Sequence, residues 1–141
     1  MKIEPFGNIK LNVKDNEWFG DVENICPHNK VELSICLQST NQDLSQKIDL
    51  VKELASDYEK IVASLYDLAY QKYKNTEFEV TREEIEKMYF LSAVNLKEDN
   101  ETWWLTMEPN FNVTPIYNHF LRFTMHRRKI IWANFEINIT S

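Results

Sequence analysis

Glycine and cysteine are scarce in this sequence, and several kinds of functional site need one or the other. Among 141 residues there are 2 Gly and 2 Cys. Loops that cradle phosphates depend on closely spaced glycines, and neither a P-loop nor a dinucleotide-binding motif is present. Cys26 and Cys36 fall on expected neighbouring strands, several residues out of register, which is too far apart for a disulfide. The first 13 residues lack the apolar segment of a secretion signal, so we expect reduced thiols and a cytoplasmic protein.

Long apolar runs and clustered positive charge are missing as well. No run approaches the roughly 20 apolar residues that a membrane-spanning helix needs. The net charge of −6 argues against nucleic acid as the main partner, because phosphate contacts need clustered Lys and Arg. We therefore expect neither a membrane nor a nucleic acid as partner. The length fits one domain that spans residues 1–141.

The longest regular pattern in the chain covers residues 44–74. Its apolar side chains fall within one arc of about 160° when each residue advances by 100°, and no Gly or Pro interrupts it. This pattern predicts a single helix about 45 Å long. Such a helix either lies on a sheet or pairs with a second copy as a coiled coil. The wide stripe and the interruption of the heptad at Lys72 favour the sheet.

Alternating apolar and polar residues predict strands on both sides of this helix. The expected strands cover residues 6–13, 18–25, 31–37, 93–97, 102–107, 117–125 and 130–139. Thr81 and Glu84 form a capping box that begins a short second helix ending near residue 91. The fold class is therefore α+β: an antiparallel sheet, made of an N-terminal three-stranded meander and C-terminal hairpins, with the long helix and the short helix on one face.

Two adjacent tryptophans, Trp103 and Trp104, are the main candidates for a binding site. Neighbouring residues of a strand point to opposite faces, so one indole should enter the core and the other should reach the far side of the sheet. If that side is open, the second indole forms a recognition patch beside Tyr117, Phe120 or Trp132. The alternative is that the loop 109–115 covers it.

Other candidates are more ordinary in character. His119, Arg122 and Trp104 are candidates for a ligand pocket between the long helix and the open edge of the sheet. Glu53 and Asp57 lie on the polar face of the long helix, which is either a docking surface for a basic partner or a solvated face. The basic turn 126–129 is either a hydrophilic tip or an anion site. The three histidines lack the spacing of metal ligands and no nucleophile motif is present, so we expect no metal, no cofactor and no catalytic residues.

The N-terminal half carries a resemblance. Phe6-Gly7 precedes a strand, Trp18-Phe19-Gly20 begins the next, and the alternating strand 31–37 leads into the long amphipathic helix. This arrangement resembles small uncharacterised bacterial families that share an F-G…W-x-G N-terminal hairpin. Some members are immunity proteins, which neutralise a toxin by binding it. The resemblance covers residues 6–75 and implies a non-enzymatic protein-binding function.

Three hypotheses follow. The first is a protein-binding module such as an immunity protein, whose acidic charge would speed capture of a basic bacterial toxin. The second is a small ligand-binding domain or an enzyme, with a pocket near His119, Arg122 and Trp104. The third is a structural module that associates with itself, with the exposed Trp patch or the overhanging end of the long helix as the dimer contact. The three hypotheses together leave a monomer or a homodimer as the expected state.

Overall fold

The structure is a computed structural model that describes residues 1–110 and 120–135. These residues form an α+β fold with three helices, α1 (Ser45–Ser56), α2 (Tyr58–Tyr73) and α3 (Arg82–Met88). The strands are β1 (Lys2–Ile3), β2 (Gly7–Asn8), β3 (Lys10–Asn12), β4 (Glu17–Val22), β5 (Val31–Cys36), β6 (Tyr89–Leu96), β7 (Thr102–Pro109), β8 (Leu121–His126) and β9 (Lys129–Phe135). The expected strand 6–13 is split into β2 and β3, and parts of 117–125 and 130–139 lie outside the described residues.

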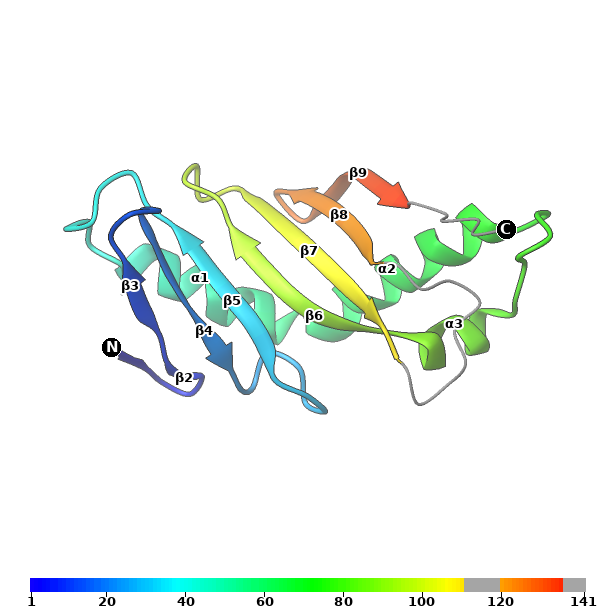
Figure 1. Ribbon diagram of the computed structural model, residues 1–141, viewed down its shortest axis with the longest axis horizontal. Coiled ribbons are helices and arrows are strands. Elements are labelled where there is room, and N and C mark those ends of the chain that lie inside the picture. The colour runs from blue at the N-terminus through cyan, green and yellow to red at the C-terminus, as the bar shows by residue number, and fades with distance from the viewer. Residues whose placement is uncertain (111–119, 136–141) are drawn as a thin grey trace.

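Seven strands form one sheet in the order β3-β4-β5-β6-β7-β8-β9 (Figure 1). The predicted meander is present as β3, β4 and β5, and β6 to β9 are antiparallel neighbours. The prediction of a wholly antiparallel sheet is wrong, because β5 runs parallel to β6, with Leu33 opposite Val94. The three helices lie between these strands in the chain and return it to the end of the sheet where β5 began, as a parallel pair requires.

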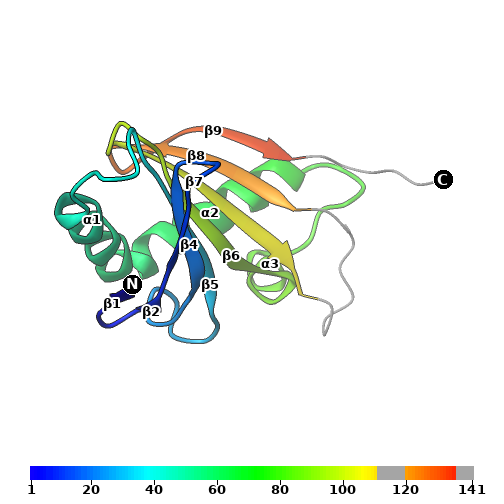
Figure 2. The same cartoon turned by 60° about the vertical axis from the view of Figure 1, so that its left-hand side comes forward.

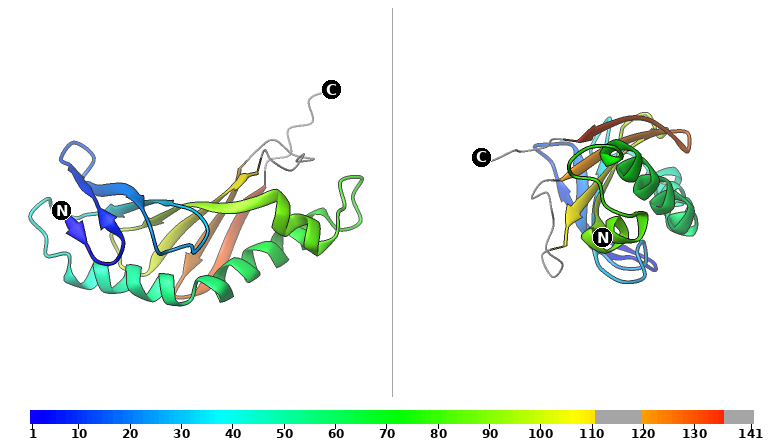
Figure 3. Two further views of the ribbon diagram at one scale, coloured as in Figure 1. Left: turned by 90° about the horizontal axis from the view of Figure 1, so that it is seen from below. Right: turned by 90° about the vertical axis from the view of Figure 1, so that its right-hand side faces the viewer.

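The stretch 44–74 does not form one helix, so that prediction is also wrong. Asp57 separates α1 from α2 and has φ −99° and ψ 10°. Its N–H donates to both Glu53 O and Leu54 O, and its own carbonyl accepts from Ile61 N–H. Backbone hydrogen bonding therefore continues across Asp57 while the axis bends. Figure 3 shows the two helices curving along one side of the sheet.

The predicted second helix begins as expected. Thr81 accepts a hydrogen bond from Glu84 N–H, and the Glu84 carboxylate accepts one from Thr81 N–H, so the capping box is confirmed. The helix is shorter than expected and ends at Met88, where β6 begins. Figure 2 shows α3 at the end of the sheet where the chain enters β6.

Close packing explains why glycine occupies the last position of the W-x-G motif. A Cβ atom at Gly20 would lie 2.6 Å from the carbonyl oxygen of Asn8 and 3.3 Å from Ile9 Cα. Any larger residue would therefore push away the N-terminal segment that crosses β4. The other glycine, Gly7, has a φ of 115°, which side chains disfavour.

Each strand of the sheet separates its side chains between two faces. Val31, Leu33 and Ile35 of β5 are fully buried and belong to the same core as Val51 and Leu65 of the helices. We call the opposite side of the sheet, which points away from α1 and α2, the open face (Figure 1). Its described side chains include Phe19, Asp21, Glu32, Ser34, Asn95, Trp104, Thr106, Arg122 and Thr124.

Candidate functional site

The two tryptophans of β7 separate as strand alternation predicts. Trp103 is 5% exposed and lies in the core, whereas Trp104 is 52% exposed on the open face. Trp104 lies opposite Asn95 of β6 and Thr124 of β8, near the middle of the sheet. The ammonium of Lys97 lies 3.7 Å from the centre of the Trp104 ring, within the range of a cation–π contact. This contact orients the indole without burying it.

A shallow hollow of about 290 Å³ lies beside Trp104. Its polar lining consists of Thr106, Arg122, Thr124 and Asn134. The Arg122 guanidinium lies 5.9 Å from the ring of Phe120, and within residues 1–110 and 120–135 it forms no ion pair. The structure therefore brings together Trp104 and Arg122, two of the residues expected to bind.

The acidic part of the open face lies on β4 and β5. Asp21 and Glu32 are directly opposite each other and are both exposed. Along the same cross-strand row, Glu32 is followed by Ala93, Thr106 and Arg122. One end of the open face is thus acidic and the other carries Arg122, with Trp104 in the adjacent row between them.

Glu53 and Asp57, expected as an acidic docking surface, lie on the helical side and not on the open face. Both bind Arg128 of the β8–β9 turn: Nη2 lies 2.7 Å from Glu53 Oε1, and Nη1 lies 2.5 Å from Asp57 Oδ2. The single positive charge of Arg128 therefore balances one of their two negative charges within the molecule. Tyr117 and His119, the two remaining predicted site residues, lie outside the described residues, as does most of the loop 109–115.

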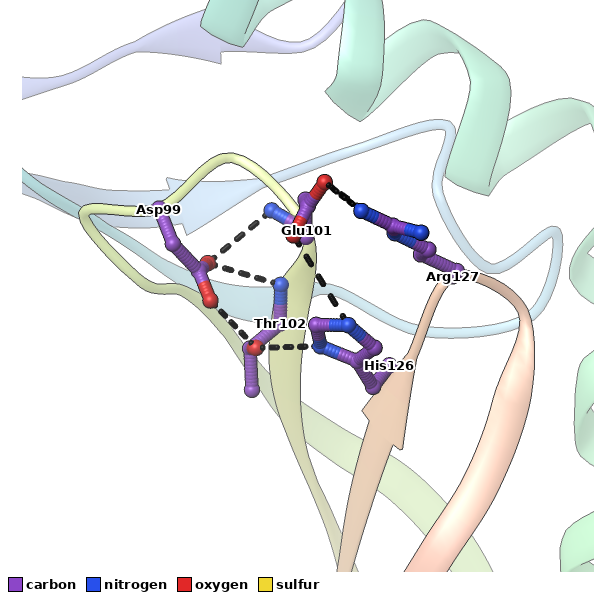
Figure 4. A network of polar contacts seen from close by, with 5 residues as sticks. All are labelled: Asp99, Glu101, Thr102, His126 and Arg127. Carbon is purple, nitrogen blue, oxygen red and sulfur yellow. Dashed lines mark hydrogen bonds and ion pairs between the residues drawn. The ribbon is translucent and has the colours of Figure 1, made fainter.

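A polar network connects the β6–β7 and β8–β9 turns (Figure 4). Thr102 Oγ1 donates to Asp99 Oδ2 over 2.7 Å and lies 3.0 Å from His126 Nδ1. Because its single proton goes to the carboxylate, the Thr102 hydroxyl accepts from His126, which places a proton on Nδ1. His126 Nε2 then faces Glu101 Oε2 at 3.7 Å. Burial raises the pKa of Asp99, but hydrogen bonds from Thr102 and Glu101 and the nearby His126 outweigh it and lower that pKa.

This network contains the side chains closest to a metal-ligand arrangement in the described part of the chain. One ligand atom each of Asp99, Glu101 and His126 lies within 4.8 Å of the others. However, Asp99 Oδ1 accepts from two backbone N–H groups, and Glu101 Oε1 binds the Arg127 guanidinium at 2.6 Å. A cation at this point would compete with these hydrogen bonds at Asp99 and would share the Glu101 carboxylate with Arg127, since Glu101 Oε2 faces His126. Sequence reasoning missed the network because strand pairing, and not sequence spacing, brings Thr102 opposite His126.

The two thiols are buried next to polar side chains. Cys26 and Cys36 are free and buried. Cys26 Sγ donates its single proton to Asn29 Oδ1 and lies 3.2 Å from Tyr58 Oη, whose hydroxyl can donate to the sulfur, and Cys36 Sγ donates to Asn95 Oδ1. Burial raises the pKa of Cys36, although Lys97 opposes this, so its thiol is protonated at neutral pH. A nucleophilic thiol needs the opposite shift, and neither sulfur has a hydrogen-bonded histidine among the described residues.

Comparisons of this chain with known protein families, with curated protein sequences and with solved structures found no match. Among the described residues, no helix combines the length and the apolar character needed to cross a membrane. The site is therefore defined by its geometry alone. Its centre is Trp104, its hollow contains Arg122, and its acidic end contains Asp21 and Glu32.

Proposed function

We propose that this protein is a non-enzymatic protein-binding module that acts through the open face. The observation that carries the proposal is the exposure of Trp104, which leaves a large rigid aromatic side chain near the centre of a sheet face. Trp and Arg are enriched among residues that contribute most to binding energy, and Arg122 lies in the adjacent hollow. Phe19, 37% exposed, lies on the same face in the same cross-strand row, separated from Trp104 by Ser34 and Asn95.

The difference between the two faces of the sheet supports the open face as the binding surface. We infer that α1 and α2 cover the other face of the sheet, since their buried side chains belong to the same core as the strands. That face is thereby used for folding. The open face, where Trp104 is 52% exposed among short threonine, serine and asparagine side chains, is the contact surface for another protein.

The partner is of the toxin type and carries a basic patch. The exposed carboxylates of Asp21 and Glu32, which form no ion pair with the other described residues, complement such a patch, and the net charge of −6 favours its approach. The immunity role itself comes from the resemblance of residues 6–75 to families with an F-G…W-x-G hairpin. A cytoplasmic location, which the sequence favours, belongs to the same proposal.

A second candidate function is the binding of a small acidic molecule. The hollow beside Trp104 favours it, because Arg122, two threonine hydroxyls and Asn134 surround a space of about 290 Å³ next to an aromatic ring. A thermal-shift screen against small carboxylates and phosphates distinguishes the two functions. Stabilisation by several degrees that is lost in Arg122→Gln would favour the small ligand.

The test of the protein-binding function starts with capture from the source cell. The wild-type chain and Trp104→Ala are used as baits, with Val13→Ala as a matched control because Val13 is an exposed apolar residue of the β3–β4 turn. The expected result is a basic protein captured by the wild type and the control but not by Trp104→Ala. Expression of that protein alone should arrest growth, and co-expression of this chain should restore it. A captured protein that does not arrest growth would contradict the immunity role.

A further inference from the structure

The outer edge of β9 is a second surface that can bind another chain. β9 is the last strand of the sheet, and within the described residues only β8 pairs with it (Figure 2). Ile131 lies at the register shift between the two strands and is 60% exposed. An edge strand presents backbone N–H and C=O groups that can pair with an added strand.

A hollow of about 310 Å³ lies next to this edge, between β9 and α2. Its apolar lining comes from Ile61 of α2, Met125 of β8 and Ile130 of β9. Met125 and Ile130 are cross-strand partners. In a sheet, residues directly opposite each other point to the same face. A residue of an added strand opposite Ile130 would therefore point into the hollow.

The polar rim of the hollow is basic. It contains Lys60, Arg128 and Lys129, with Asp57 as its acidic member. Arg128 is already bound to Asp57 and Glu53. Lys60 and Lys129 form no ion pair in the described ranges. In a chain with a net charge of −6, two unpaired lysines beside an apolar floor favour an acidic occupant.

We propose that an extended acidic segment of a partner protein adds to the sheet along the outer edge of β9. Its backbone pairs with β9, its apolar side chains fill the hollow over Ile61, and its carboxylates bind Lys60 and Lys129. This mode of recognition takes affinity from main-chain hydrogen bonds and specificity from alternate side chains. It goes beyond the proposed function, because it uses the edge of the sheet and none of the residues around Trp104.

A second copy of this chain is a poorer occupant. The β9 sequence, Lys129 to Phe135, contains no Asp or Glu. Pairing of β9 with β9 would therefore place no carboxylate from residues 129–135 opposite either lysine. The two lysines of the hollow therefore favour an acidic segment of a different protein over a second copy of this chain.

The test uses two defined peptides with the full chain. One is a nine-residue capped peptide of alternating valine and glutamate, and the other replaces each glutamate by lysine. NMR titration and amide hydrogen exchange are measured for both. The glutamate peptide should bind and slow exchange of the outward amides of β9, while the lysine peptide should not. Lys60→Glu combined with Lys129→Glu should weaken binding at least tenfold.

Matched controls separate this proposal from its competitors. Lys14→Glu combined with Lys72→Glu changes the net charge equally at two exposed lysines elsewhere, and it should leave binding of the glutamate peptide within twofold. Trp104→Ala should also leave it unchanged, so the two sites can fail separately. Equal binding of both peptides, or no binding, overturns the proposal. So does binding that appears only after removal of residues 136–141, or a dimer that the peptide dissociates, because either result assigns the edge to another occupant.

Discussion

Asp21 of β4 lies directly opposite Glu32 of β5, with both carboxylates on the open face. Neither forms an ion pair within residues 1–110 and 120–135. Like charges in this arrangement destabilise a sheet. The chain thus retains a pair that lowers the stability of the free protein on the face that we propose binds a basic partner, where the same pair becomes favourable.

Removal of one of these charges should stabilise the free protein. Glu32→Gln is expected to raise the free energy of unfolding by about 0.5 kcal/mol at low salt, and by less at 1 M salt because the repulsion is screened. Urea unfolding measures both values. Glu77→Gln, which alters an exposed acid in the turn after α2, should change stability less. A destabilised Glu32→Gln variant, or equal effects at both positions, would show that the repulsion is negligible.

The ion pairs of Arg128 should stabilise the bend between α1 and α2. Arg128→Met is expected to lower the free energy of unfolding by about 0.5–1 kcal/mol, because one guanidinium holds both Glu53 and Asp57. Arg127→Met is the matched control. Both arginines have positive φ, 50° and 70°, so the backbone cost is similar in each variant. The Arg127 side chain, however, is 70% exposed, and among the described residues it pairs with Glu101 alone. Equal losses in the two variants would contradict a specific role for Arg128.

Lys47 should make stability increase with pH. It is fully buried, and its ammonium donates to Asn100 Oδ1 at 2.5 Å and to Lys97 O at 3.4 Å. Burial lowers the pKa of Lys47, although nearby acidic groups oppose this, whereas an unfolded lysine has a pKa of about 10.4. The unfolded state therefore binds the proton more tightly, and the cost of the buried charge disappears as pH rises toward the unfolded value.

The difference in unfolding free energy between wild type and Lys47→Met isolates this effect. Between pH 7 and pH 10 it should shift in favour of the wild type, because the variant has no proton to lose. Urea unfolding at each pH provides the measurement, and Lys72→Met, at an exposed position of α2, should show no such trend. A pH-independent difference for Lys47→Met would show that burial does not lower the pKa of Lys47.

Local sequence patterns predicted the parts of the fold that local physics determines. The alternation of β5, the capping box at Thr81 and the opposite directions of Trp103 and Trp104 all follow from neighbours within a few residues. The break at Asp57 could not be predicted in this way. The apolar stripe of residues 44–74 continues through the bend, and Asp57 forms its ion pair with Arg128, which lies far along the chain. The parallel pairing of β5 and β6 likewise depends on how the helices return the chain.

The candidate site likewise combines residues that the sequence could identify with residues that only strand pairing brings together. Trp104 could be identified as one of two residues, but only the burial of Trp103 selects it. Arg122 was a candidate for a pocket at the open sheet edge, and the register of β7 and β8 places it in the hollow beside Trp104. Asp21 and Glu32 were missed because their pairing depends on the register of β4 and β5. Glu53 and Asp57 were chosen for their negative charge, and both form ion pairs with Arg128 that the sequence spacing does not reveal.

The most direct test of a binding surface centred on Trp104 is the affinity of the captured partner for two single variants, measured by titration calorimetry. Trp104→Ala should weaken binding by at least about 30-fold, corresponding to the 2 kcal/mol or more of a hot-spot residue, with its unfolding midpoint nearly unchanged. Val13→Ala should remain within twofold of wild type. Equal affinity of Trp104→Ala and wild type for the partner would contradict the assignment of the open face as the binding site.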